Sequence, residues 1–432
     1  MVDLRRESSG FLLDNARWLA GGFLLTLFSS FGQTFFIGLS NSDLRAAFHL
    51  SAGAFGGLYM LATLASAFSL PWLGRTLDRM PGWKVARFTM PALSLACGLI
   101  AVAPNVVVLA LSLYLLRLFG QGMMTETAFT EIGRLFVANR GRAMALIAPG
   151  QQAGTAVFPL LVVTMDRASA SWRTSWLASA ALIVSIGMPS IIGLMKVERL
   201  PSSQQTNTRG VRTARDWTRS EVIRDPLLYL LLLGTVAPAF IGAIIFFDQD
   251  YLIDLRAYDP VAFAAAYPIM SITTVLFGFV CGHLIDRVGA LKLLPYFLVP
   301  LAIAAAAVGL ITPIWGVYLF MLLFGTSNGF TSTLLGALWP EVYGLANLGG
   351  IRAIIVSAMV LSSAVGPGLS GILLDGGVSL PTQMLWLSAW CVVACFVLAF
   401  AARRVRLVTK RWRHRTSPRF DLTTHSMSAE PS

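Results

Sequence analysis

The sequence predicts an all-α membrane protein with twelve transmembrane helices in two six-helix pseudo-symmetric bundles. Composition is the first observation behind this prediction. The 432 residues are 56% hydrophobic and 12% charged, whereas soluble domains carry about 25% charged residues. The second is a series of apolar runs close to the ~20 residues that a helix needs to cross a bilayer. The third is a set of short motifs that recurs in the second half. Soluble enzymes, disordered chains and secreted disulfide scaffolds are therefore excluded.

The first half, residues 1–195, contains six predicted spans. They lie near 18–39, 54–73, 88–104, 106–127, 144–165 and 175–195. The first span is longer than the apolar core of a signal peptide, about 7–15 residues, and no small-residue cleavage site follows it. We therefore expect it to remain in the membrane as the first helix.

A polar linker, residues 196–226, separates the two halves. It contains seven Lys and Arg residues and is too short to form a domain. The second half, residues 227–402, contains six more predicted spans. They lie near 227–247, 262–282, 291–311, 314–337, 352–373 and 383–402. The tail, residues 403–432, carries eight basic residues, and we expect it to lie against anionic lipid head groups.

The positive charges predict the orientation. With the N-terminus inside, the inner segments hold 28 of the 33 Lys and Arg residues, as the positive-inside rule requires. This distribution explains the net charge of +12 without a nucleic-acid partner. We expect a multi-pass protein of the bacterial cell inner membrane with both termini in the cytoplasm.

Two sets of motifs repeat between the halves. The first set follows the second and eighth spans and consists of Gly74, Asp78 and Arg79 with the copy Gly282, Asp286 and Arg287. The second set pairs a glutamate with an arginine eleven residues later, and consists of Glu131 with Arg142 and Glu341 with Arg352. The repetition predicts two parallel bundles with a transport pathway between them.

These repeated charges are candidate gating residues. Asp78 is expected to cap the inner start of the eleventh span, and Asp286 that of the fifth, because a carboxylate is stabilised at a helix N-terminus. The expected ion pairs of this inner latch join Arg79 or Lys84 to Glu131 and Arg287 to Glu341. Alternatively, the charges only fix the topology.

At these motifs the chain resembles the major facilitator superfamily, over nearly its whole length. Arg117-Leu-Phe-Gly120-Gln-Gly122 is similar to the arginine motif in that superfamily's fourth helix. Gly150-x-x-x-Gly154 with Pro159 resembles a degenerate glycine/proline motif of the fifth helix. The segments that begin at Asn139 and Gly150 resemble bacterial monocarboxylate-type members. The resemblance implies a transporter, but the charges that eukaryotic monocarboxylate carriers use in helices 1 and 8 are missing here.

Arg117 is the one charge expected near the middle of the membrane. A charge at this depth costs at least ~2.5–3.5 kcal/mol, so it normally faces a polar cavity or a partner. The planar guanidinium fits a carboxylate or a phosphate. Arg117 is therefore a candidate ligand of an anionic substrate, and the alternative is a scaffold that binds backbone carbonyls of a neighbouring helix.

Other polar residues at this depth are candidate substrate ligands. They are Gln33, Gln151, Gln152, Tyr267 and Asn328. No Asp or Glu lies near the middle of a predicted span, so an anionic or neutral solute is favoured over a cation. Proton coupling would need Glu126, Asp248 or a carboxylate of the substrate itself.

The sequence thus predicts a monomeric secondary active transporter that works by alternating access, with a small organic anion such as a monocarboxylate as substrate. Transport would be proton symport or exchange. Efflux of drugs or metabolites is the alternative within transport, and a transport-inactive membrane sensor is an alternative of another class. We expect no enzyme activity, because no triad or paired mid-membrane carboxylates occur, and no cofactor or metal.

Overall fold

The computed structural model describes residues 2–136, 139–169, 171–197, 217–344 and 347–416. Within these ranges the chain forms helices and no β-strand. Most of the predicted linker and residues 417–432 of the predicted tail lie outside the described residues. The side chain of Asp78 also lies outside the described part of the structure.

The first half of the chain forms fourteen helical segments in the described ranges. They are α1 (Val2–Phe28), η1 (Ser29–Gly32), α2 (Thr34–Gly38), α3 (Asn41–Phe48), α4 (Ala52–Arg79), α5 (Gly82–Val102), α6 (Val106–Leu115), η2 (Leu116–Met124), α7 (Thr125–Leu135), α8 (Arg140–Ile147), α9 (Pro149–Ser169), α10 (Trp172–Leu182), η3 (Ile183–Gly187) and α11 (Met188–Met195).

The second half continues with eleven helices in the described ranges. They are α12 (Arg219–Arg224), α13 (Pro226–Thr235), α14 (Ala237–Phe247), α15 (Gln249–Arg256), α16 (Pro260–Ala264), α17 (Tyr267–Val288), α18 (Ala290–Leu293), α19 (Val299–Leu310), α20 (Trp315–Tyr343), α21 (Leu348–Asp375) and α22 (Leu380–Thr416).

Ten helical stretches of the described chain are long and apolar enough to cross a membrane. They cover ten of the twelve predicted spans. The ninth predicted span coincides with α19, an apolar helix of 12 residues, and the tenth with α20. Large apolar side chains such as Phe68, Val107 and Phe396 are more than 70% exposed, which suits lipid rather than water. The protein is thus a multi-pass membrane protein, and the count of twelve stays a prediction.

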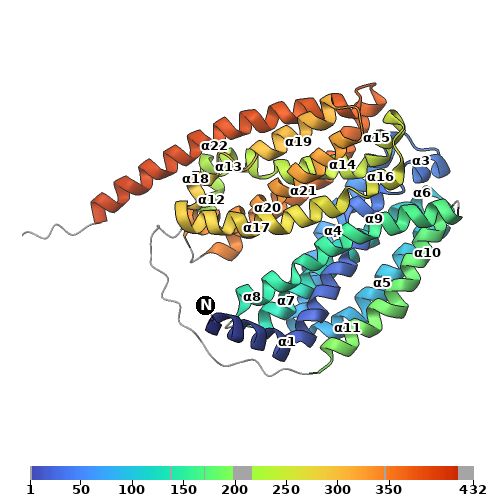
Figure 1. Ribbon diagram of the computed structural model, residues 1–432, viewed down its shortest axis with the longest axis horizontal. Helices are drawn as coiled ribbons and strands as arrows, with labels where there is room; N and C mark the ends of the chain where they lie inside the picture. The colour runs from blue at the N-terminus through green and yellow to red at the C-terminus, as the bar shows by residue number, and fades with distance from the viewer. Residues whose placement is uncertain (1, 137–138, 170, 198–216, 345–346, 417–432) are drawn as a thin grey trace, which may run out of the picture.

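The helices of the two halves form two groups, which lie close together at one end of the molecule and diverge toward the other (Figure 1). We call the end that holds the start of α1 and the last turns of α22 the terminal end, and the opposite end, near α3 and α15, the distal end. Across the boundary α4 packs against α21 and α9 against α17. The region between the groups is where a solute pathway would lie.

Two irregular segments meet beside this boundary. The first membrane helix is interrupted at Gln33, which is extended (φ −81°, ψ 153°) between η1 and α2. Facing it, η2 is wound as a π-helix, a form frequent at functional sites. A Cβ on Gly32 would lie 2.2 Å from the carbonyl oxygen of Leu116, and one on Gly120 would lie 2.6 Å from the Cα of Gly32. Only glycine permits this approach.

Candidate functional site

A cavity of about 460 Å³ lies between the two groups of helices, within the ~300–1,000 Å³ of typical small-molecule sites. Both halves of the chain line it. The lining residues are Gln33, Thr34, Phe35, Gln121, Gln151, Gln152 and Thr155 from the first half, and Pro238, Ala239, Gly242, Ala243, Phe246, Met270, Phe324, Asn328, Val356, Met359, Val360 and Ser363 from the second.

The lining combines neutral polar groups with an aromatic wall. Five side-chain amides and several hydroxyls face the cavity, and its described lining contains no Asp, Glu, Lys or Arg. The rings of Phe246 and Phe324 meet edge to face with centroids 5.2 Å apart, and Phe35 lines the same space. Such a surface can orient a small polar or amphipathic solute through hydrogen bonds and apolar contact.

Four of the six predicted substrate ligands lie in this lining: Gln33, Gln151, Gln152 and Asn328. Their role in binding remains a prediction. Tyr267 does not line the cavity: it is fully buried, and its hydroxyl donates to Gln249 Oε1 at 2.7 Å.

Gln121 lines the cavity and was missing from the prediction. The sequence signal for it is its place between Gly120 and Gly122 in the motif that begins at Arg117. In η2 this position turns toward the cavity opposite the interruption at Gln33.

Arg117 lies behind the cavity wall rather than in it. Its side chain is 2% exposed, and its Nη1 donates to the Gly32 carbonyl oxygen at 3.1 Å and to Thr34 Oγ1 at 3.4 Å. The guanidinium lies 5.3 Å from the centre of the Tyr59 ring, and the Tyr59 hydroxyl lies 2.8 Å from Thr34 Oγ1. Arg117 therefore holds the interruption of the first helix, as in the scaffold alternative.

The charge of Arg117 is not neutralised by a nearby acid in the described part of the chain. The ion pairs described there are Arg134 with Glu131 and Arg167 with Asp259. The Nε atom of Arg117 is buried and has no hydrogen-bond partner among the described residues. Thr34 lies between the guanidinium and the cavity. Arg117 can therefore act on a solute in the cavity through its electrostatic potential, without direct contact.

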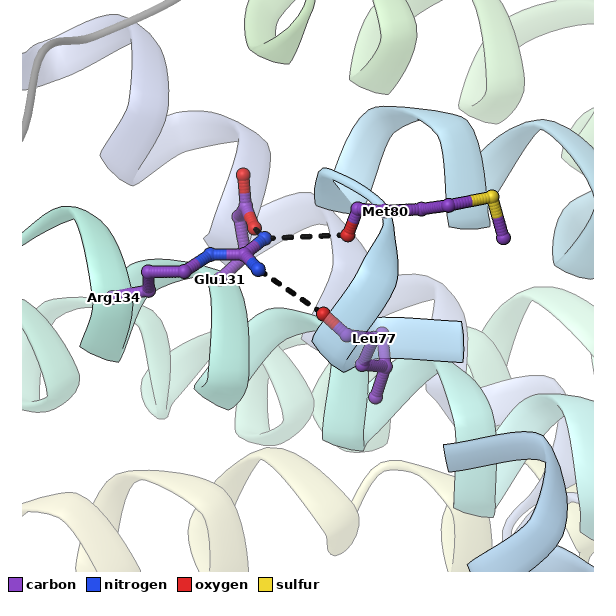
Figure 2. Close-up of polar contacts among 4 residues, drawn as sticks. All are labelled: Leu77, Met80, Glu131 and Arg134. Atoms are coloured by element: carbon purple, nitrogen blue, oxygen red, sulfur yellow. Dashed lines mark hydrogen bonds and ion pairs between the residues drawn. The ribbon is translucent and has the colours of Figure 1, made fainter. Parts of the chain in front are cut away.

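The inner latch expected at Glu131 is not formed in this conformer. Figure 2 shows Glu131 paired with Arg134, one helical turn further along α7. The ion pairs of the described residues include none between Glu131 and Arg79 or Lys84. Arg134 also donates to the carbonyl oxygens of Leu77 at 3.1 Å and Met80 at 3.3 Å. The contact ties the end of α4 to α7 within the first group. Arg134 is an (i, i+3) neighbour on the same helix, which places its guanidinium within ion-pair reach of Glu131.

The second expected ion pair is also replaced. A carboxylate oxygen of Glu341 accepts the backbone N–H of Ala290 at 3.1 Å, at the start of α18, while Asp286 and Arg287 are exposed. The contact follows Gly289, whose φ of +84° is a conformation that other residues rarely adopt. Like the contact of Glu131, it lies within one group of helices.

Among the remaining predicted gating residues, the two glycines have open surroundings and the two arginines are exposed. A Cβ on Gly74 would meet no atom within 4 Å, and one on Gly282 only Thr333 at 3.8 Å. Arg142 and Arg352 are exposed. Arg352 borders a small crevice between α20 and α21 with Trp339.

The two groups are instead joined at the distal end, along a contact that we call the distal seam, formed by α2 and α3 with α14 and α15. Asn41 Nδ2 donates to the Phe247 carbonyl oxygen at 2.6 Å, and Gln249 Nε2 donates to that of Phe35 at 3.0 Å. The Ser42 backbone N–H donates to Asp250 at 3.2 Å.

A helix cap reinforces the seam. Asp375, the last residue of α21, accepts the backbone N–H groups of Ala52 at 3.0 Å and Gly53 at 2.9 Å and the hydroxyl of Ser51 at 2.6 Å. A carboxylate of the second group thus caps the N-terminus of α4 in the first. No repeat or motif marks this aspartate, so the sequence prediction missed it.

Comparison with known proteins agrees with this architecture. The family profile described as Major Facilitator Superfamily matches residues 22–367. Among curated proteins none gives a significant match.

The chain is also similar to solved structures. One is the crystal structure of a bacterial homolog of the human lysosomal transporter Spinster, inward-facing and unoccupied, at 13% identity and TM-score 0.63, over 93% of this chain and 98% of that one. Another is the nucleoside transporter NupG, at 15% identity and TM-score 0.66, over 90% and 99% of the two chains. At such identities the likeness shows a shared fold. With the family match over most of its length, this chain belongs to the Major Facilitator Superfamily of transporters.

Proposed function

We propose that the protein is a secondary active transporter that carries a small organic anion by alternating access through the cavity between its two halves. The cavity, the contacts of the distal seam and the divergence of the helices toward the terminal end support this proposal. With both termini in the cytoplasm, as the positive charges predict, the described conformer faces inward.

Arg117 is the observation that carries the choice of an anion. A buried guanidinium without an acidic partner among the described residues leaves net positive charge behind Thr34, and Thr34 lines the cavity. Two unit charges ~8 Å apart interact by about 2 kcal/mol at an effective dielectric constant of ~20. That corresponds to ~30-fold in affinity for an anion. The neutral amides would then supply hydrogen bonds, and a monocarboxylate fits this combination.

The repeated motifs would act in the other conformer. When the terminal end closes, Asp78 and Asp286 would approach helix starts of the opposite group, and Glu131 and Glu341 could exchange their present partners. Coupling by proton symport or by exchange needs no further charge in the cavity wall, because the solute carboxylate can carry the proton. We propose that the monomer is sufficient for transport and that the basic tail contacts anionic lipids.

Efflux of an uncharged, partly aromatic solute is the second candidate. It is favoured by a cavity lining without formal charge in the described residues and by the wall of Phe35, Phe246 and Phe324. In this case Arg117 would act only on the first helix. The two candidates differ in whether the charge of the solute matters.

Uptake by proteoliposomes distinguishes them. Labelled lactate and pyruvate are compared with lactamide and pyruvamide, which are similar in shape and lack the charge, with and without an acidic exterior. We expect saturable uptake of the acids, stimulated by the pH gradient, and no uptake of the amides above empty liposomes. Equal transport of acid and amide would contradict an anion carrier, and failure of both with extrusion of neutral aromatic dyes would favour efflux.

Arg117→Gln is the matched variant. We expect it to lower the affinity for the acids by about 30-fold; because Arg117 also bonds to Gly32 and Thr34, the affinity is measured on the folded, monodisperse fraction. Arg75→Gln, which removes an exposed charge at the terminal end of α4, is the control and should behave as the wild type.

A further inference from the structure

Asp248 is a buried carboxyl group in the middle of the distal seam. It lies between α14 and α15, just beyond the candidate span Pro226–Phe247, and is 2% exposed. Its neighbours in the chain, Phe247 and Gln249, both bond to the first group of helices. Any separation of the two groups at this end must therefore expose Asp248 to water.

The Asp248 carboxyl group has hydrogen-bond partners but no ion-pair partner among the described residues. Ser370 Oγ donates to its carboxyl at 2.7 Å, and the Asn41 amide of the first group contacts the same carboxyl. Asn41 is itself 2% exposed, and its Oδ1 has no donor among the described residues. Arg45 acts on Asp248 through its charge but forms no ion pair with it in the described structure. The bonds from Ser370 and Asn41 favour the charged carboxylate, while a protonated Asp248 avoids the cost of a buried charge and can donate as well as accept.

Acidic and basic groups of several helices lie around this part of the seam. The charged and titratable groups on the elements packed around this part of the seam are Asp43, Arg45 and His49 of α3 and its end, Tyr59 of α4, Asp166 and Arg167 of α9, Asp250, Tyr251, Asp254 and Arg256 of α15, Asp259 before α16, Tyr267 of α17 and Asp375 of α21. Four of the acids border one pocket of about 270 Å³ shared by both halves: Asp43, Asp166, Asp250 and Asp254. Asp248 does not line this pocket, and the charge that acts on it directly is that of Arg45, which favours the ionised form; burial is what makes a charge at Asp248 unfavourable.

We propose that Asp248 binds a proton when the distal seam closes, so that the proton is a ligand of the seam and favours its closed form. The inference rests on the proposed alternating-access cycle and goes beyond it by naming the residue through which pH acts on the cycle. It concerns the distal seam, whereas the anion proposal concerns the central cavity.

The expected pH dependence follows from the two forms of the seam. Burial raises the pKa of Asp248 to about 7 in the closed seam, while the hydrogen bond from Ser370 and the charge of Arg45 lower it less. In an open, hydrated seam the pKa would return toward ~3.9, the ordinary value for Asp. The closed form thus binds the proton more tightly. The free energy that proton binding contributes to closure has its full value below the pKa of the open seam, about 4. It is lost as the pH rises to the pKa of the closed seam, about 7.

Electron-spin distance measurements across the seam test the proposal without any solute. Spin labels replace Ala46 of α3 and Leu255 of α15, two exposed positions on opposite sides, in a chain whose four cysteines are replaced by alanine. We expect the ratio of the short-distance to the long-distance population to fall at least tenfold from pH 5.5 to pH 8. A ratio that stays constant over this range would overturn the proposal.

Three variants make the assignment to Asp248 specific. Asp248→Asn is expected to keep the short distance at every pH, with a change below threefold, because the amide cannot ionise. Asp254→Asn removes an exposed acid of the same helix and should keep the full response. Ser370→Ala removes a donor to the charged form and should move the midpoint to higher pH. A wild-type response in Asp248→Asn, or an unmoved midpoint in Ser370→Ala, would refute the assignment.

The test separates this inference from the proposed function. If the distances respond to pH as described but proteoliposomes take up no acid, the choice of substrate is wrong and the seam proposal stands. If the acids are carried and the distances ignore pH, the proton binds elsewhere.

Discussion

Removal of the carboxylate of Asp375 should open the distal seam. This residue is the cap that α21 places on the N-terminus of α4, with two backbone N–H donors and the Ser51 hydroxyl between 2.6 and 3.0 Å from its oxygens. In the outward-open conformer these partners must separate, since α4 and α21 belong to different groups. The cap therefore contributes only to the closed form.

The magnitude follows from the geometry and the exposure of the cap. A carboxylate at a helix N-terminus contributes about 0.3–1 kcal/mol at an exposed site, and Asp375 is exposed. We take about 1 kcal/mol for Asp375→Ala, which corresponds to about a fivefold loss in the ratio of closed to open seams. Asp375→Asn keeps an acceptor but loses the charge, so about half of this effect in free energy is expected.

The assay is the distance measurement between labels at Ala46 and Leu255, at pH 6. Asp14→Ala is the control, because Asp14 is an exposed acid at the terminal end. The long-distance population should grow about fivefold relative to the short one in Asp375→Ala and remain unchanged in the control. An unchanged distribution in Asp375→Ala would show that the cap does not hold the seam, and a loss of the folded protein would show that it has a larger structural role.

The remaining predictions concern the first group of helices. Gly120→Ala should lower the thermal midpoint by several degrees in a melting assay, because the added Cβ would lie 2.6 Å from the Cα of Gly32. Gly98→Ala is the control: its Cβ would meet no atom within 4 Å, so the thermal midpoint should stay the same or rise. Arg134→Gln should increase hydrogen exchange at the end of α4, whose carbonyls it binds, and protection equal to the wild type would contradict this role. Arg117→Lys should lower the affinity for acids less than Arg117→Gln in the uptake assay, and equal losses would show that the charge is not what the solute senses.

The sequence predicted the parts of the fold that local patterns determine. Ten of the predicted spans coincide with helices long and apolar enough to cross a membrane, because ~20 apolar residues have few stable alternatives to a helix in lipid. Four of the predicted polar residues reach the cavity lining, Gln33 and Asn328 among them. A large amide in an apolar span is costly unless it faces a polar space.

The distal seam could not be predicted in the same way. Asn41 and Phe247 are 206 residues apart, and Ser51 and Asp375 are 324 apart, so no spacing in the sequence brings them together. The prediction also assigned Glu131 to Arg79 or Lys84, which lie at the end of α4 and the start of α5, while its partner Arg134 lies on its own helix. Which of several nearby cations pairs with a carboxylate depends on the conformer, and a repeated motif marks only the positions.

Counterflow in proteoliposomes tests the central claim most directly, namely that the protein is an alternating-access carrier of small organic anions. Vesicles loaded with unlabelled lactate are diluted into labelled lactate, and the label inside is followed over time. The account predicts a transient accumulation of label above its external concentration, absent from vesicles loaded with lactamide and strongly reduced in Arg117→Gln. Simple equilibration without an overshoot, or an overshoot that lactamide supports equally well, would contradict it.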